Sequence, residues 1–518
     1  MTALGAAARS GPAEKSIHVG WITVTTVLAT TLQTIDTTIA NVALPHMQGA
    51  MSATQDQISW VLTSYIVAIA IMTPPTGWLA GRFGRKRLFL ASIAGFTLAS
   101  MACGAASTLE EIVIFRLLQG AFGAAIVPLS QSIMLDTYPR ERHGMAMALW
   151  GMGVMIGPIL GPTLGGFLTD NYSWRWVFYI NVPVGALAFV GMLLFVPETE
   201  RNRERPFDWF GFTLLSLAIG GVQMMLDRGE LKGWFDSLEI IAWAVIAGLG
   251  FYLFVVHIMT AKHPFLEPGL FADRNFVTGI VIMFVVGILL LSSLALLPPF
   301  LQNLMDYPVM TTGMILAPRG LGTIIAMMIN GRIVGKVDSR ALILLGLGIT
   351  AYSLHQMSGF TLDTSGPAVA WSGFIQGLGL GFIFVPLSAL TFATLAPRFR
   401  TEGTSIFNLM RNIGSSIGVS IVMYLLATNV QVNHASLVEY ATPFNGAFNL
   451  PNIVAFWNLK ELAGLAALNA EINRQAAVIA YLDDFTFMMW LTIASMPLIL
   501  LLKPVRHSLP PDAAAVGE

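Results

Sequence analysis

The sequence predicts an all-α polytopic membrane protein, with a six-helix half toward each end of the chain and two helices inserted between the halves. The first observation is composition, because the 518 residues are 55% hydrophobic and only 11% charged. The mean hydropathy is +0.70, whereas soluble domains carry about 25% charged residues. The other two observations are a series of membrane-length apolar windows and an internal repeat. A soluble fold would leave several domains with almost no charged surface, so it is excluded.

Fourteen apolar windows are long enough for a helix to cross a bilayer. They lie at residues 19–43, 57–80, 88–107, 111–134, 145–168, 176–196, 209–226, 238–260, 276–300, 312–334, 341–361, 368–394, 403–428 and 481–502. The first window is too long for a signal-peptide core and lacks a small-residue cleavage site after it, so we interpret it as a retained span. An even number of spans places both termini on one side of the membrane.

Lysine and arginine orient these predicted spans. With a cytoplasmic N-terminus, twenty of them fall on the cytoplasmic side and five on the other, while Arg116, Arg319 and Arg411 lie inside spans. This excess follows the positive-inside rule, which is sensitive to a missed span. We therefore expect both termini to be cytoplasmic.

Four pairs of short motifs recur at offsets of 254 to 257 residues. The pairs are Gly77-x-x-x-Gly81 with Gly331-x-x-x-Gly335, Pro45-x-x-Gln48 with Pro299-x-x-Gln302, Gly157-x-x-x-Gly161 with Gly414-x-x-x-Gly418, and Gln119-Gly120 with Gln376-Gly377. Four matches in one register predict two parallel six-span repeats, a plan known from membrane transporters. The expected units are a cytoplasmic tail at 1–18, a first half at 19–196, inserted spans at 197–260, a second half at 261–502 with an outer loop at 429–480, and a tail at 503–518.

Asp36 is the most informative single residue, because it lies inside the window at 19–43. A charge at membrane depth costs at least a few kcal/mol. On a helical wheel it shares one polar arc with Thr26, Thr30, Gln33, Thr34, Thr37 and Asn41. Interhelical hydrogen bonding is our interpretation of the threonines. An ionisable carboxyl is a costly packing contact, so for Asp36 we favour a proton-binding or substrate-binding role.

Two arginines inside spans are candidate partners for Asp36. Arg116 stands near the start of the window at 111–134, where its side chain either snorkels to the interface or faces a cavity as a fixed positive charge. Arg411 stands within the window at 403–428, where snorkelling is a poorer explanation. We assign Asp36 and Arg116 to proton coupling. The residues expected around a substrate cavity are Gln33, Thr37, Asn41, Gln119, Asn408 and Arg411.

A run rich in glycine and proline occupies residues 153–166. Its small residues permit close helix packing, and its prolines remove backbone hydrogen bonds. It lacks the lysine of a phosphate-binding loop. We predict a mechanical role at the seam between the halves for Gly157, Pro158, Gly161 and Pro162.

A basic cluster follows the second window at residues 77–87. Its charge sets topology on the cytoplasmic side. Its glycine spacing indicates a second role, in which it latches helix ends together in one conformational state. The residues expected to contribute are Gly77, Arg82, Gly84 and Arg85.

Several classes of function are excluded. The net charge of −1 gives no basic surface for nucleic acid, and Cys103, the only cysteine, permits no intrachain disulfide. The histidines are scattered without metal-ligand spacing, and no nucleotide-binding motif occurs. We therefore expect no enzyme and no cofactor. Without a motif for ATP, the energy for transport comes from an ion gradient, or transport is passive.

The outer loop at 429–480 allows two interpretations. Its second part has apolar residues at helical spacing, from Leu459 to Ile472. The loop either caps the transport pathway or offers a docking surface to an extracytoplasmic partner. Both interpretations stay open at this point.

Five sequence blocks resemble one known family. LQTIDTTIANVALP at Leu32–Pro45 is similar to the first-span signature of fourteen-span drug:proton antiporters. The other blocks follow in family order and are RLLQGAFGAA, GVMIGPILGPTLGG, WRWVFYINVPVG and FNLMRNIGSSIG. The chain thus resembles the EmrB/QacA group of the major facilitator superfamily, and its long last loop resembles the EmrB branch.

This resemblance implies the major facilitator fold and alternating access in a bacterial inner membrane. It implies multidrug efflux of small lipophilic compounds against proton influx, with Asp36 as proton site and Arg116 assisting. It also implies a periplasmic adaptor and an outer-membrane channel as partners. Gly81 departs from the family pattern, since many members have an acidic residue there, so the usual charge latch and the partner of Arg82 are in question.

Two alternatives remain. A permease of the same class could export one physiological compound, such as a fatty acid or a siderophore. A non-transporting receptor or scaffold belongs to another class, and the repeated halves and buried Asp36 argue against it because a scaffold needs neither.

Overall fold

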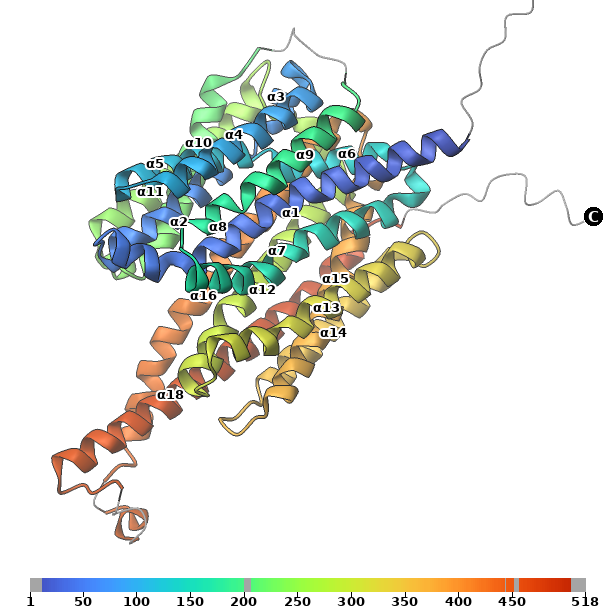
Figure 1. Cartoon of the computed structure of the whole chain (residues 1–518). Helices are drawn as coiled ribbons and strands as arrows, with labels where there is room; N and C mark the ends of the chain where they lie inside the picture. Colours follow the sequence, from blue (N-terminus) through green and yellow to red (C-terminus); the bar gives the residue numbers. More distant parts are fainter. Residues whose placement is uncertain (1–11, 200–205, 443, 451–455, 505–518) are drawn as a thin grey trace, which may run out of the picture.

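The computed structural model describes residues 12–199, 206–442, 444–450 and 456–504, and within them the chain is helical, with no β-strand. Figure 1 shows two groups of helices that lie side by side, coloured blue to green and yellow to red. The first group, here called the first half, comprises α1 (Pro12–Ala50), α2 (Gln55–Met72), α3 (Thr76–Phe83), α4 (Arg85–Ala105), α5 (Leu109–Gly123), α6 (Ile126–Thr137), α7 (His143–Asn171), α8 (Trp176–Tyr179) and α9 (Asn181–Phe195). The second half comprises α12 (Arg274–Pro299), α13 (Val309–Ile333), α14 (Ser339–Met357), α15 (Gly366–Ala393), α16 (Arg400–Val438) and α18 (Leu462–Ser495).

Among the described residues, eleven helices are long and apolar enough to cross a membrane, or twelve if the bent pair α2 and α3 counts as one span. Each of the fourteen predicted windows overlaps a described helix or a pair of consecutive helices. Helices α1 and α14 do not meet this length and hydropathy criterion. For α1 the reason is the threonine-rich arc around Asp36, which lowers the hydropathy of a helix that is otherwise long enough.

Helix ends follow the local sequence. Thr54 and Thr108 each form a capping box with the glutamine or glutamate three residues later, which starts α2 and α5. The chain bends by 61° between α2 and α3, where two consecutive prolines remove backbone donors. Gly84 has φ +92° at the junction of α3 and α4, a conformation that favours glycine.

The repeated glycines mark equivalent helix contacts in the two halves. Gly157 on α7 faces the backbone of Thr34 on α1, and Gly414 on α16 faces the backbone of Phe284 on α12. Similarly, Gly120 on α5 packs on α2, and Gly377 on α15 packs on α13. A Cβ at any of these positions would collide with a neighbouring backbone. The repeat in the sequence thus corresponds to a repeat in helix packing.

The glycine–proline run uses two faces of α7, and Ile159 of the run packs on Gly320 of α13 in the second half. Gly157 and Gly161 face α1, within the first half. A different face of α7 meets the second half, where Gly144 approaches Val334 and Gly151 approaches Met327. Side chains of one helix project to different faces, so α7 can use one face inside its own half and another across the seam.

The inserted helices α10 (Trp209–Gly229) and α11 (Leu238–Thr260) pack on each other. Helix α10 also contacts both α2 and α16, so it spans the gap between the halves along one side. Ser420 on α16 donates to the carbonyl of Leu226 on α10 at 3.2 Å. Thr63 on α2 donates to Asp227 of α10. The inserted pair is therefore connected to both halves.

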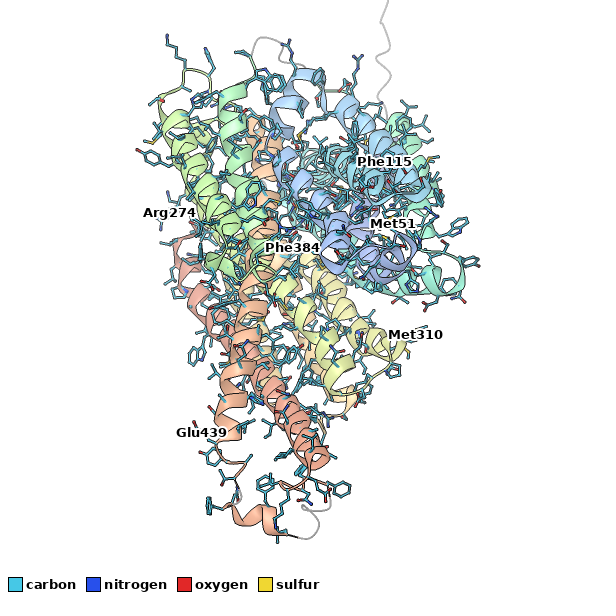
Figure 2. All side chains as sticks on the ribbon, turned by 90° about the vertical axis from the view of Figure 1, so that its left-hand side faces the viewer. Met51, Phe115, Arg274, Met310, Phe384 and Glu439 are labelled. Atoms are coloured by element: carbon cyan, nitrogen blue, oxygen red, sulfur yellow. The ribbon has the colours of Figure 1, made fainter. Side chains whose placement is uncertain are left out.

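Helices α16 and α18 extend well beyond the rest of the bundle at one end (Figure 1). Figure 2 shows Glu439 near the end of this projection. The described part of the connection carries exposed aromatic side chains, including Phe444 and Phe456. Helix α18 begins at Leu462, which agrees with the helical spacing expected up to Ile472.

Candidate functional site

Asp36 lies in the interior of the first half, and both of its carboxylate oxygens are hydrogen bonded. Oδ2 accepts a bond from Arg116 Nη1 at 2.7 Å. Oδ1 accepts bonds from Gln119 Nε2 at 2.8 Å and from Asn181 Nδ2 at 2.7 Å. The side chains of Asp36 and Arg116 are both 0% exposed. The carboxylate is thus held by donors from α5 and α9 while α1 carries it.

Arg116 is fixed by several further contacts. Its Nε donates to the carbonyl of Val61 at 3.1 Å, and its Nη1 also donates to Gln119 Oε1 at 2.9 Å. Arg116 and Gln119 are three residues apart on α5, so they share one helix face. The ring of Tyr65 lies 3.8 Å from the guanidinium carbon. Arg116 therefore does not snorkel to the interface, and it is Arg116 rather than Arg411 that contacts Asp36.

A second tier of side chains positions Asn181. Its Nδ2 also contacts Ser100 Oγ at 3.0 Å, and Ser100 donates to the carbonyl of Phe178 at 2.9 Å. Asn181 belongs to the block WRWVFYINVPVG but was not among the predicted site residues. A polar amide inside an apolar span is the signal that could have identified it.

The threonines of α1 behave only partly as expected. Thr34 and Thr37 bond to carbonyls of their own helix, at residues 30 and 33, which satisfies their hydroxyls locally. Thr30 bonds across to Ser130 of α6 at 2.7 Å. Thr26 also bonds across to Met134 of α6 at 3.2 Å, so the interhelical hydrogen bonding expected for this arc occurs at Thr26 and Thr30.

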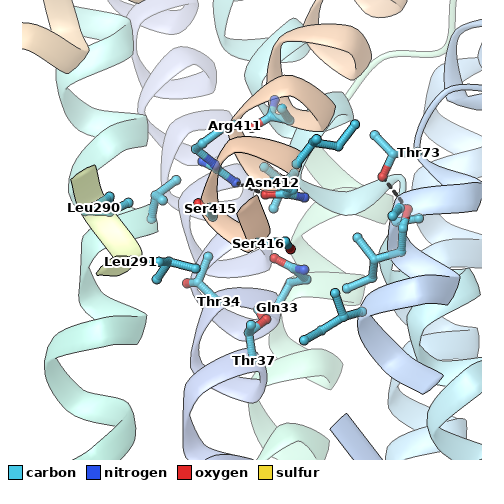
Figure 3. Close-up of a pocket in the computed structure, with 18 of the residues that line it drawn as sticks. Gln33, Thr34, Thr37, Thr73, Leu290, Leu291, Arg411, Asn412, Ser415 and Ser416 are labelled. Atoms are coloured by element: carbon cyan, nitrogen blue, oxygen red, sulfur yellow. Dashed lines mark hydrogen bonds between the residues drawn. The ribbon is translucent and has the colours of Figure 1, made fainter. Parts of the chain in front are cut away.

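A cavity of about 180 Å³ lies between the two halves, next to the ion pair. Figure 3 shows Gln33, Thr34 and Thr37 from α1 opposite Arg411, Asn412, Ser415 and Ser416 from α16. Gln223 of α10 completes the wall on the side of the inserted helices. The apolar lining residues include Ile66, Ile69, Val154, Met155, Leu290, Leu291 and Ile413.

The predicted cavity residues divide into three groups. Gln33, Thr37, Asn408 and Arg411 line the cavity, as does Pro158. Gln119 is not in its wall and instead bonds to Asp36. Asn41 is exposed and is not among the lining residues of this cavity, so its assignment to the substrate cavity stays a prediction. It stands more than one helical turn beyond Thr37, past the end of the cavity.

Tyr65 separates the cavity from the ion pair. Its side chain belongs to the cavity wall and its ring covers the guanidinium of Arg116. Asp36 itself is not a lining residue. A ligand in the cavity would therefore meet Tyr65 and Gln33 before it met the carboxylate.

A cluster of charged and hydroxyl side chains joins the halves where α4 and α16 begin and α6 ends. Asp136 at the end of α6 forms ion pairs with Arg85 of the first half and Arg400 of the second. Ser132 lies 3.0 Å from Thr401 of α16, and Arg85 donates to Ser132 at 3.1 Å. We call these five residues the latch cluster.

The basic loop contributes to this region in different ways. Gly77 of α3 approaches the backbone of Glu402 so closely that a Cβ would lie 2.9 Å from its Cα. Arg82 lies in the last turn of α3, and Gly84 forms the turn into α4. Arg85 is the residue of the predicted set that reaches Asp136. Asp136 and Arg400 were not predicted, because no pattern links residues 264 positions apart.

Comparison with known proteins identifies the family. A model of the Major Facilitator Superfamily matches residues 26–419, and the chain belongs to this family. It is 36% identical over 496 residues to "Multidrug export protein EmrB" of Escherichia coli strain K12, covering 93% of this chain and 95% of that protein. It is 34% identical over 499 residues to "Fatty acid resistance protein FarB" of Neisseria gonorrhoeae, covering 96% and 98%.

Solved structures share the fold at low sequence identity. The human organic anion transporter MFSD10 (TETRAN) matches with a TM-score of 0.57 and 12% identity, covering 93% of this chain and 100% of that chain. The proton:xylose symporter XylE matches with a TM-score of 0.56 and 13% identity, covering 92% and 96%. The chain is a membrane protein with the major facilitator fold.

Proposed function

We propose that this protein is a proton-coupled multidrug efflux permease of the bacterial inner membrane, which exports lipophilic compounds by alternating access. The observation that carries the proposal is the fully buried Asp36–Arg116 pair. The ring of Tyr65 covers the guanidinium, and Tyr65 also lines the cavity between the halves. The identity to multidrug export proteins over nearly the whole chain supports it. A buried ionisable pair at membrane depth is costly, and such pairs are typical of proton relays.

The proposed topology has fourteen spans with both termini in the cytoplasm. The twelve candidate spans, with the bent pair counted as one, are joined by α1 and α14, which pack within the bundle. The domain boundaries proposed from the sequence remain a first half at 19–196, inserted spans at 197–260 and a second half at 261–502. The packing of α1 on α7 and of α12 on α16 supports this division.

In this topology the latch cluster lies at the cytoplasmic face. Its ion pairs join α4, α6 and α16 there, which supports the assignment of this conformation to a state closed to the cytoplasm. Proton binding to Asp36 would neutralise the carboxylate and weaken its attraction for Arg116. The donors from Gln119 and Asn181 would remain to orient the carboxyl group. Relaxed attraction between α1 and α5 is then the event that couples protonation to rearrangement of the halves.

Replacement of Asp36 by asparagine tests the coupling. Asparagine keeps the shape but cannot exchange a proton, so we expect proton-driven dye extrusion to fall to the background of vesicles without the permease. Removing one partner of a buried pair costs about 3–5 kcal/mol, so membrane insertion is measured in parallel by yield and monodispersity. The matched control is Asp363→Asn, an exposed carboxylate between α14 and α15. Undiminished extrusion by Asp36→Asn in energised vesicles would refute proton coupling through this residue.

A dedicated exporter of one physiological compound is the second candidate. The similarity to a fatty acid resistance protein favours it, with a fatty acid rather than a siderophore as cargo. A substrate screen in an efflux-deficient bacterial host, with and without a protonophore, separates the two candidates. Resistance to several unrelated compounds supports multidrug efflux, and resistance to one compound class supports the dedicated exporter.

A further inference from the structure

Arg411 is the one charged side chain among the described residues that line the cavity. Its neighbours in the wall are amides, hydroxyls and apolar side chains, with no carboxylate. Its Nη2 contacts Asn412 Oδ1 at 3.4 Å, which is at the long limit of a hydrogen bond. Its Nη1 is buried and has no hydrogen-bond partner within the described residues. The guanidinium therefore contributes an uncompensated positive charge to the cavity wall.

Asp36, the carboxylate of the proposed coupling site, does not compensate the positive charge of Arg411. Asp36 is occupied by Arg116, Gln119 and Asn181, and Tyr65 stands between it and the cavity. Burying a charge without a partner is expensive, and the cost is offset only by an opposite charge or strong hydrogen bonds. Arg411 faces a cavity that can hold a ligand, so the ligand is the available source of that opposite charge.

The surroundings of Arg411 fit a ligand with an acidic head group. Asn408, Arg411, Asn412 and Ser415 recur at helical spacing on α16 and line one side of the cavity. The amide of Asn408 already donates to Gln131 and Thr404, and the hydroxyl of Ser415 donates to the carbonyl of Gly287. The guanidinium of Arg411 keeps donors available, and it suits a carboxylate because it can donate two parallel bonds to it. Figure 3 shows this polar face across from Gln33 and Thr37 of α1.

The remaining wall fits an apolar portion attached to that head group. Leu290 and Leu291 of α12 lie beside the polar face (Figure 3), and Ile66 and Ile69 of α2 also line the cavity. We propose that Arg411 binds the acidic head group of amphipathic anions, so that lipophilic carboxylates are preferred over lipophilic cations. This inference rests on the proposed efflux function and adds the charge of the substrate to it.

A transport experiment with matched probes tests the preference. Everted vesicles carrying the wild-type protein, Arg411→Gln or Arg411→Lys are given a fluorescent long-chain fatty acid and, separately, a neutral lipophilic dye. Hydrogen bonds to charged groups contribute about 1.5–3 kcal/mol, so the ratio of carboxylate to dye export should fall about 10-fold or more in Arg411→Gln. Arg411→Lys should keep part of the preference. The matched control, Arg332→Gln at an exposed position on α13, should leave the ratio at the wild-type value.

A direct measurement of ligand binding distinguishes failure of this inference from failure of the efflux proposal. Laurate and dodecyltrimethylammonium have equal chain lengths and opposite charges, so thermal stabilisation of the purified protein by each isolates the head group. We expect stabilisation by laurate that Arg411→Gln removes and Asp36→Asn retains. Equal stabilisation by both ligands, or an unchanged export ratio in Arg411→Gln, would overturn the inference. Wild-type protein that binds laurate but exports neither probe would refute the efflux proposal while leaving the anion site standing.

Discussion

At the scale of single residues, the proposed coupling role of Asp36 depends on its fixed set of donors and its shielded position. Two amides and a guanidinium reach its oxygens at 2.7–2.8 Å. The amides remain useful whether the carboxyl is charged or neutral, since an amide both donates and accepts. The guanidinium responds to the charge. Protonation therefore changes one contact strongly and the others little, which suits a switch.

The ring of Tyr65 leads to a specific prediction about proton leakage through this site. Its ring covers Arg116 and forms part of the cavity wall, so Tyr65→Ala should connect the cavity to the ion pair. We expect a proton leak without substrate, measured as faster dissipation of a pH gradient in proteoliposomes with an enclosed pH-sensitive dye. Tyr65→Phe is the matched control, because it retains the ring and a cation–π contact of about 0.5–2 kcal/mol. A leak in Tyr65→Ala no faster than in the wild type would show that the ring is not the barrier.

The depth of a residue in the membrane explains which site residues the sequence predicted. Asp36 was predictable because a carboxyl at bilayer depth is expensive. Its contact with Arg116 was one of two options that the sequence left open. Asn181 and Tyr65 escaped notice because amides and tyrosines are cheap enough in spans to serve ordinary packing. The burial of Asp484 on α18, with neither oxygen bonded to a described residue, was missed although the same cost applies to it.

At the scale of elements, the repeat predicted two parallel halves, and the structure shows that its glycines make equivalent helix contacts in each half. The pairs α1 with α7 and α12 with α16 follow from glycines at equivalent positions. The contacts between the halves use the other face of α7, and the repeat glycines Gly77 and Gly331 lie at this seam, against Glu402 and Ala148. The position of α10 against both α2 and α16 was unpredictable, since the repeat contains no counterpart of the inserted helices.

The projecting ends of α16 and α18 carry the prediction about partners. Their exposed aromatic side chains include Tyr440, Phe444 and Phe456, and exposed apolar patches mark interaction surfaces. Deletion of residues 440–475 should weaken association with a periplasmic adaptor at least several-fold, measured by co-purification from crosslinked membranes. The control is deletion of residues 505–518, which leaves α16 and α18 unchanged. Unchanged co-purification would instead favour the interpretation of this loop as a cap over the pathway.

At the scale of the whole molecule, the two halves contact each other at the latch cluster, between α6 and α16, and along α7. Asp136 is the centre of the cluster, since it pairs with an arginine from each half. This pairing gives the closed end a charged contact even though Gly81 lacks the acidic side chain expected from the family pattern. Glu402 occupies the space left by Gly77, so the close approach of α3 and α16 depends on glycine there.

The latch cluster predicts how loss of the Asp136 charge changes the equilibrium between the conformations closed and open to the cytoplasm. The side chain of Asp136 is 28% exposed, so each of its pairs is screened and contributes about 1 kcal/mol or less. Asp136→Asn should therefore raise the population open to the cytoplasm up to about 30-fold, as two such pairs are lost. The readout is the rate of maleimide labelling of Ser416→Cys in the cavity wall, from the cytoplasmic face, in a Cys103→Ala background.

A matched carboxylate distinguishes the latch from a general effect of charge. Asp338 bonds to Arg340 at 2.8 Å within the second half and joins no helices across the seam. Asp338→Asn removes one ion pair at the same end of the molecule, so it should leave the labelling rate of Ser416→Cys unchanged. If Asp136→Asn and Asp338→Asn label at the same rate, the ion pairs of Asp136 do not hold the halves closed. The contacts of α7 with α13 and the hydrogen bonds from Thr404 and Asn408 of α16 to Pro128 and Gln131 of α6 would then hold the halves together.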